Sequence, residues 1–252
     1  MDIAKASLQF FEDQIRVRKK NRSASLKAYG DLTTAYAQCL AVLNILPKEF
    51  ASQPGNTNSS ISNRLSLIAS FIQGIDICEV SISESMYIQA AAILKQEIET
   101  ISAILECQKG CRKEGNVPQI GFLPLTMRIN YGRFNDIAHV GKSDVLSAYL
   151  CDPRTQYKDS DKSAISLTPV FDADASTTMY GIHISLCLKL VDEMCILFSE
   201  MYQSFFLSDE IISVLGSTMQ ILLDYGFVQE TKDDTTDTIF VNSYAFQNGA
   251  SK

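Results

Sequence analysis

Two segments of the chain carry apolar residues at the spacing of an amphipathic helix. In residues 83–109 the apolar positions advance in steps of three and four, which places them on one stripe of a helix. Residues 177–206 show the same helical spacing. We therefore predict two long helices whose stripes form much of the core. The stripe residues are Tyr87, Ala91, Leu94, Ile98, Ile101 and Leu105 in the first helix, and Met179, Ile182, Leu186, Leu190, Met194, Leu197, Met201 and Phe205 in the second.

Shorter patterns and capping residues predict the remaining helices. Asn58 and the two serines after it are candidate caps, as is Ser208. Pro47 is expected to end one helix, and Gly132 and Gly141 to interrupt another. The expected helices cover residues 3–22, 26–46, 61–75, 125–150 and 209–224. The apolar side of the first of them consists of Ile3, Phe10, Phe11, Ile15 and Val17.

The pattern is different in two regions. Residues 152–174 read as a long loop before the second long helix, which Ser176 or Thr177 is expected to cap. Loops of this length are typical of a binding loop, a lid or a mobile connection. Residues 226–231 and 238–245 are rich in Val, Ile, Phe and Tyr and flank a polar turn, so we predict a β-hairpin there.

These elements predict an all-α fold, a helical bundle with extra helices and a small C-terminal β-hairpin. Composition agrees, because the 252 residues include only 12 glycines and 6 prolines, whereas all-β chains need many turns. We expect one single-core helical domain over residues 1–225, including the loop 152–174, followed by an acidic hairpin or tail over residues 226–252.

Charge is unevenly distributed along the chain. Residues 191–252 hold 10 acidic and 2 basic residues, so the net charge of −7 leaves +1 for residues 1–190. Near the start lies a basic run without any acidic residue. Such a run is typical either of a surface that contacts nucleic-acid phosphates or of a solvated helix face. It consists of Arg16, Arg18, Lys19, Lys20, Arg22 and Lys27.

Cysteine usage and missing motifs exclude several classes of protein. The seven cysteines form no CxxC pair and the chain has only two histidines, so we expect reduced core thiols in a cytoplasmic protein rather than a disulfide framework or a zinc site. No secretory signal and no run of 18 apolar residues is recognisable, so we expect no membrane association. No phosphate loop or dinucleotide-binding glycine pattern occurs, and we expect no cofactor and no metal.

The densest group of chemically useful side chains surrounds His139. On one helix, Asn135 and Asp136 precede it by four and three residues, so both can reach the imidazole and tune it for acid–base work. Arg133 precedes it by six residues, which is about 240° around a helix at roughly 100° per residue. Arg133 and His139 can therefore meet only if the helix begins after Arg133 or if a second chain contributes one of them. The alternative is a buried histidine satisfied by Asn135, Asp136 or a carbonyl.

The segment YIQAAAILKQEIET (87–100), followed about thirty residues later by YGRFNDIAH (131–139), resembles a group of bacterial helical proteins similar to the HEPN superfamily. HEPN proteins are four- to five-helix bundles that are frequent in toxin–antitoxin and phage-defence loci. Their nucleases cut RNA without a metal, typically across a dimer, through an Arg-x(4–6)-His motif. The resemblance implies that Arg133 binds the phosphate and that His139 acts as general acid or base.

Two positions depart from the nuclease pattern. Phe134 follows the arginine where active members have a polar residue, and Lys95 stands where an arginine is expected. We therefore favour a non-catalytic interaction or sensor protein of a bacterial phage-defence or toxin–antitoxin locus, working as a homodimer or with a partner protein. The alternative is a metal-independent ribonuclease, with RNA as substrate and Arg133 and His139 at a dimer interface. The candidate binding residues beside this site are Lys95, Glu99, Tyr131 and Lys142.

Overall fold

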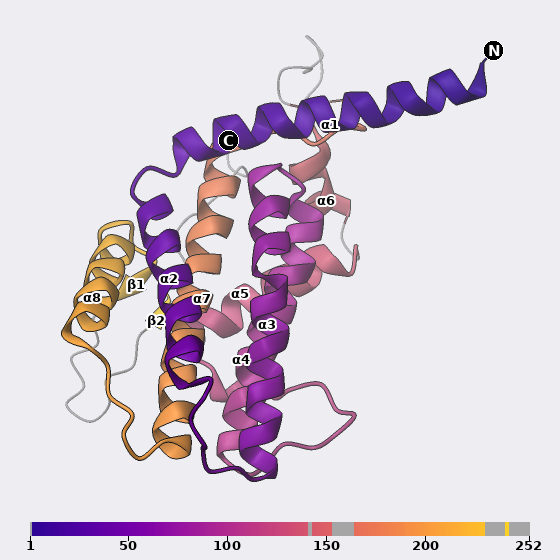
Figure 1. Cartoon of the computed structure of the whole chain (residues 1–252). Coiled ribbons are helices and arrows are strands. Elements are labelled where there is room, and N and C mark those ends of the chain that lie inside the picture. The colour runs from indigo at the N-terminus through magenta and orange to yellow at the C-terminus, as the bar shows by residue number, and fades with distance from the viewer. Residues whose placement is uncertain (1, 141–142, 153–163, 230–239, 242–252) are drawn as a thin grey trace.

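The computed structural model describes residues 2–140, 143–152, 164–229 and 240–241 (Figure 1). Nearly all of its regular elements are helices, which confirms the predicted all-α fold. The elements are α1 (Ile3–Ala28), α2 (Leu32–Phe50), α3 (Ser59–Ser83), α4 (Tyr87–Gln108), the short 3-10 helix η1 (Ile120–Phe122), α5 (Leu125–Ala138), α6 (Ser143–Leu150), α7 (Ala173–Met201), α8 (Asp209–Asp224), β1 (Val228–Gln229) and β2 (Phe240–Val241).

Helix α7 is the centre of the bundle. It packs against α2, α3 and α4, so most of its residues from Ala175 to Phe198 are buried. Helix α5 packs on α4, and α8 packs on α2. Figure 1 shows α1 lying across one end of the bundle, with its N-terminal part extending past the other helices. The apolar stripes predicted for residues 83–109 and 177–206 thus face each other and their neighbours in one core.

The C-terminal half of α1 is tied to the bundle by a buried network of hydroxyl groups. The Ser25 hydroxyl donates to the Ser83 carbonyl oxygen at 2.8 Å and accepts from Ser176 at 3.0 Å. The Tyr29 and Ser176 hydroxyls lie 2.9 Å apart, and the Tyr29 ring stacks on Tyr180 with 3.9 Å between centroids. This network joins α1 to α3 and α7.

The first two helices end later than predicted. Helix α1 continues through the basic run to Ala28, and the break falls at Gly30, which has φ +52°. A Cβ at Gly30 would lie 2.6 Å from the Tyr225 hydroxyl oxygen, so the turn requires glycine. Helix α2 continues through Pro47 to Phe50. Phe50 stacks on Tyr202 with 4.7 Å between centroids, and this packing holds the last turn although Pro47 donates no N–H.

Other helix boundaries are partly confirmed. Asn58 and Ser208 cap α3 and α8 as predicted, although α3 runs to Ser83 instead of residue 75. Helix α7 begins before the expected caps, because the Asp172 side chain accepts from a backbone N–H in its first turn, whereas Ser176 is buried inside the helix. It ends at Met201 instead of residue 206.

The helix predicted over residues 125–150 is two helices. Helix α5 ends at Ala138, and α6 begins at Ser143. The interruption lies at His139 and Val140, and Val140 has φ +46°. Gly132 lies inside α5 and does not break it, and Gly141 lies outside the described residues.

The C-terminal prediction is tested only in part. Strands β1 and β2 pair antiparallel, with Val228 opposite Val241. Residues 230–239 and 242–252 lie outside the described residues, so the hairpin as a whole and the domain division at residue 225 stay predictions. Residues 153–163 of the predicted loop also lie outside, and Cys151 and Ile165 on either side of them form an isolated antiparallel bridge.

One described helix, α3, is long and apolar enough to cross a membrane by length and composition, with a mean hydropathy of 1.6 over its best window. This is weak evidence, because buried core helices pass the same test. Helix α3 packs against α1, α4 and α7, and its own buried residues include Arg64 and Glu79.

Candidate functional site

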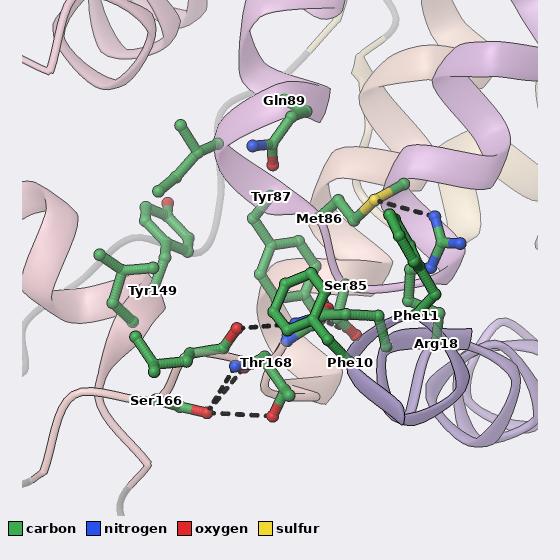
Figure 2. Close-up of a pocket in the computed structure, with 15 residues that line it drawn as sticks. Phe10, Phe11, Arg18, Ser85, Met86, Tyr87, Gln89, Tyr149, Ser166 and Thr168 are labelled. Atoms are coloured by element: carbon green, nitrogen blue, oxygen red, sulfur yellow. Dashed lines mark hydrogen bonds between the residues drawn. The ribbon is translucent and has the colours of Figure 1, made fainter. Parts of the chain in front are cut away.

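A pocket of about 520 Å³ lies beneath α1, where this helix crosses the start of α4. Figure 2 shows Phe10, Phe11 and Arg18 on the α1 side of the pocket and Tyr149 of α6 on the other. The remaining wall comes from residues 85–89 and 166–169. Four segments far apart in the sequence therefore form this pocket.

The polar groups of the pocket hold its walls together. The Tyr87 hydroxyl donates to the Asp172 carbonyl oxygen at 2.9 Å and accepts from the Asp172 N–H at 3.1 Å. The Gln14 side-chain amide donates to the Leu167 carbonyl oxygen at 3.0 Å and so ties α1 to the opposite wall. Burial raises the pKa of Tyr149 to about 12, although nearby Arg133 opposes the shift. The Tyr149 hydroxyl is thus uncharged near neutral pH and can act there as a hydrogen-bonding group.

Helix α1 exposes several large apolar side chains near one side of the helix. Leu8, Phe11, Ile15 and Leu26 are 64%, 60%, 43% and 46% exposed. At about 100° per residue, these four side chains lie within a sector of roughly 60°. Of the apolar side predicted from the sequence, this stripe includes only Phe11 and Ile15; Ile3 and Phe10 are also exposed but lie on another side of the helix. Large exposed apolar stretches mark sites of interaction.

The basic run of α1 divides into two groups. Arg18 and Arg22 are anchored on α3 and its C-cap: Arg18 lies 3.5 Å from a Glu84 carboxylate oxygen, and Arg22 donates to Glu79 at 2.8 Å. The remaining members of the run are exposed on α1, and they are Arg16, Lys19, Lys20 and Lys27. The surface available for phosphate is therefore smaller than the sequence suggests.

The structure brings three of the predicted binding residues together between α4 and α5. Lys95 Nζ lies 3.1 Å from Glu99 Oε1, and the Tyr131 hydroxyl donates to the same oxygen at 2.9 Å. The Lys95 ammonium also lies 5.7 Å from the Tyr131 ring centroid. Burial and then the bond to Glu99 raise the pKa of Tyr131 to about 12. These contacts join α4 to α5. The fourth predicted residue, Lys142, lies outside the described residues.

The structure does not bring Arg133 and His139 onto one face. Helix α5 begins well before Arg133, so about 240° of rotation separates the two positions. His139 is exposed at the C-cap, where its backbone N–H donates to the Asn135 carbonyl oxygen at 3.1 Å. Within the described chain, its imidazole makes no hydrogen bond to Asn135 or Asp136, which are half-buried. A composite site would therefore need a second chain.

Sequence reasoning missed most of the pocket. Tyr149 and the segment 166–169 lie in regions whose helical pattern is weak or absent, and only the tertiary fold brings them to α1. One signal was available: Phe10 and Phe11 are large apolar neighbours near the start of a helix that is otherwise strongly polar. The other histidine, His183, is fully buried in α7.

No protein-family model, no curated protein and no solved structure matches this chain.

Proposed function

We propose that the protein is a non-catalytic, HEPN-like helical interaction module that assembles through α1. The observation that carries the proposal is the stripe of Leu8, Phe11, Ile15 and Leu26, left exposed on a helix that extends past its own bundle. Leaving large apolar side chains in water is unfavourable by about 25 cal/mol per Å² of apolar surface. A partner that covers the stripe recovers this free energy.

The partner that fits best is a second copy of this chain. Glu12 and Asp13 lie on the turn before the exposed Arg16, Lys19 and Lys20. Two copies of α1 packed antiparallel about an axis near Ile15 bring the acidic turn of each onto the basic turn of the other. The existing contact between Arg16 and Asp13, at 2.5 Å, is an exposed pair that contributes little and is easily exchanged.

The test is the oligomeric state of the full chain, measured by light scattering or sedimentation. We expect a dimer whose affinity falls at least about 100-fold in the double variant Leu8→Asp, Phe11→Asp, because two apolar interface residues are replaced by charges. Both positions are exposed in the single chain, so the variant should keep the helical circular dichroism of the wild type.

The matched control is Leu125→Asp at the start of α5. Leu125 is 62% exposed, close to the 64% of Leu8, but it lies on α5 and not on α1, so this variant should remain a dimer. A wild-type chain that stays monomeric at micromolar concentrations contradicts the proposal, and so does a dimer that tolerates both aspartates.

A metal-independent ribonuclease is the second candidate, favoured by one observation. His139 is exposed at the end of α5, where an arginine of another chain can approach it. The proposed non-catalytic function leads us to expect that the purified protein leaves single-stranded RNA intact in EDTA. Cleavage that is lost in both His139→Ala and Arg133→Ala, and kept in Lys27→Ala, would establish the nuclease instead.

A further inference from the structure

Three helices bring metal-binding side chains together in the middle of the core. Cys78 of α3, Glu97 of α4 and His183 of α7 each offer one donor atom, and these atoms lie within 4.8 Å of one another. Cys78 and His183 are fully buried, and Glu97 is 4% exposed. Burying a carboxylate destabilises a fold unless it is paired with another group, so the position of Glu97 beside His183 in the apolar core calls for an explanation.

The contacts within this cluster satisfy only part of it. One carboxylate oxygen of Glu97, Oε2, lies 3.0 Å from Nδ1 of His183. The other, Oε1, is buried and makes no hydrogen bond within the described chain. A buried carboxylate oxygen without a partner destabilises a fold by roughly 1–3 kcal/mol or more. Glu97 Oε1 is therefore a buried acceptor without a hydrogen bond, and it is available as a metal ligand.

We propose that Cys78, Glu97 and His183 bind one divalent transition-metal ion of the zinc class. The sulfur, the imidazole nitrogen and one carboxylate oxygen supply three donor atoms of the types that Zn²⁺ prefers, and the fourth position of the tetrahedron is left for another ligand. A thiolate and a carboxylate together balance the charge of the ion, so the filled site is electrically neutral in the core.

The observed separations are close to those that coordination needs. Donor atoms around a tetrahedral zinc lie roughly 3.3–3.8 Å apart, given bond lengths of about 2.0–2.3 Å. The distance of 3.0 Å between Glu97 and His183 is slightly shorter, and the 4.8 Å limit for the set is slightly longer. Small shifts of side chains close this difference without moving the helices.

The second ring nitrogen of His183 is also positioned. Cys187, one turn further along α7, places its sulfur 3.9 Å from Nε2, and the Tyr36 ring centroid lies 5.6 Å from that of the imidazole. Histidines that bind metals through one nitrogen generally direct the other toward a hydrogen-bond acceptor, which fixes the ring. Cys187 and Tyr36 are thus positioning residues, and Nδ1 is the donor to the ion.

The burial of the three donors determines how the site is loaded. All three lie inside the bundle, so we expect the ion to be taken up during folding and to link α3, α4 and α7 in the folded state. The competing explanation is a metal-free cluster in which Glu97 contacts both His183 and the Cys78 thiol. That cluster still leaves Oε1 of Glu97 without a hydrogen bond of normal geometry, and metal uptake decides between the two explanations.

The experiment is to unfold the full chain in guanidinium with EDTA, remove the chelator, and refold it with or without Co²⁺ or Zn²⁺. We expect one Co²⁺ per chain with a sulfur-to-cobalt charge-transfer band, and a higher melting temperature with Zn²⁺ than without. Cys78→Ser should lose the band. The matched control is Cys39→Ser, which alters an equally buried thiol outside the cluster and should keep it.

A second variant covers the case in which Cys78→Ser does not fold. Glu97→Gln conserves the shape of the side chain and a hydrogen bond to His183, so it should fold. It should bind Co²⁺ at least about 100-fold more weakly, because losing a ligand costs no less than the roughly 10–100-fold that losing a residue behind a ligand costs. The proposal is overturned if the refolded wild type takes up no metal and gains no thermal stability, if the band is unchanged in folded Cys78→Ser, or if folded Glu97→Gln binds Co²⁺ with the affinity of the wild type.

Discussion

Replacing Gly181 with alanine should destabilise the protein by about 2–4 kcal/mol, although alanine is the better helix former. Gly181 lies in the middle of α7, where a Cβ would be 2.2 Å from two ring atoms of Phe227. Phe227 is only 6% exposed, so its ring has to leave a buried position to admit the methyl group. Burial of a phenylalanine side chain contributes about 1.5–3 kcal/mol, which sets the scale of the loss.

The measurement is the free energy of unfolding by urea. The matched control is Gly216→Ala in α8, where nothing lies within 4 Å of the added Cβ. There the same substitution should stabilise the protein by roughly 0.5–1 kcal/mol. In a Phe227→Leu background, Gly181→Ala should lower the free energy of unfolding by less, because the new Cβ then meets a smaller side chain at position 227. Equal effects at positions 181 and 216 would contradict the explanation.

Removing Glu200 should destabilise the protein much more than removing its partner, Arg64. The Arg64 side chain is 2% exposed and the Glu200 side chain is 43% exposed. The guanidinium of Arg64 binds both carboxylate oxygens of Glu200, and its Nε has no other partner within the described chain. Glu200→Ala leaves a buried, unpaired charge, which we expect to lower the free energy of unfolding by about 3 kcal/mol. Arg64→Met leaves only a carboxylate that water can reach. We therefore expect this variant to lower the free energy of unfolding by only about 1 kcal/mol.

Acid unfolding provides an independent measurement of the same pair. The hydrogen bonds from Arg64 lower the pKa of Glu200 below its ordinary value. A lowered pKa stabilises the fold above the pKa of the unfolded chain, and this stabilisation disappears as the pH falls through the lowered value. The difference in the free energy of unfolding between wild type and Glu200→Ala should therefore be largest at neutral pH and decrease below about pH 4. A difference that does not depend on pH would show that the ion pair is not its cause.

Local patterns predicted the helices whose packing is regular. The stripes of α4 and α7 were visible because buried positions on a straight helix repeat every three or four residues. The start of α8 and that of α3 were visible because Ser208 and Asn58 are strong caps. Helix ends were predicted less well, since they depend on distant contacts. Gly30 ends α1 where Tyr225 approaches, and Phe50 holds α2 past Pro47.

Only some contacts of the candidate sites could be predicted from the sequence. The contact between Lys95 and Glu99 is local, at positions four apart on one helix, and could be recognised. The pocket beneath α1 and the contact between Glu97 and His183 join segments that are distant in the chain, and no spacing rule connects them. Glu97 left no comparable signal, because the apolar stripe steps from Leu94 to Ile98 and Glu97 lies beside it.

Because several cysteines are buried, the rate at which each thiol reacts measures how often the surrounding part of the core opens. None of the seven cysteines forms a disulfide, and Cys39, Cys78, Cys107 and Cys187 are buried. Burial raises the pKa of Cys39 to about 12 and that of Cys187 well above its ordinary value, so these groups stay protonated and unreactive while the bundle is closed. Alkylation of each buried thiol then requires a transient separation of α2, α3, α4 or α7. The order in which mass spectrometry finds these cysteines modified would reveal which part of the core opens first.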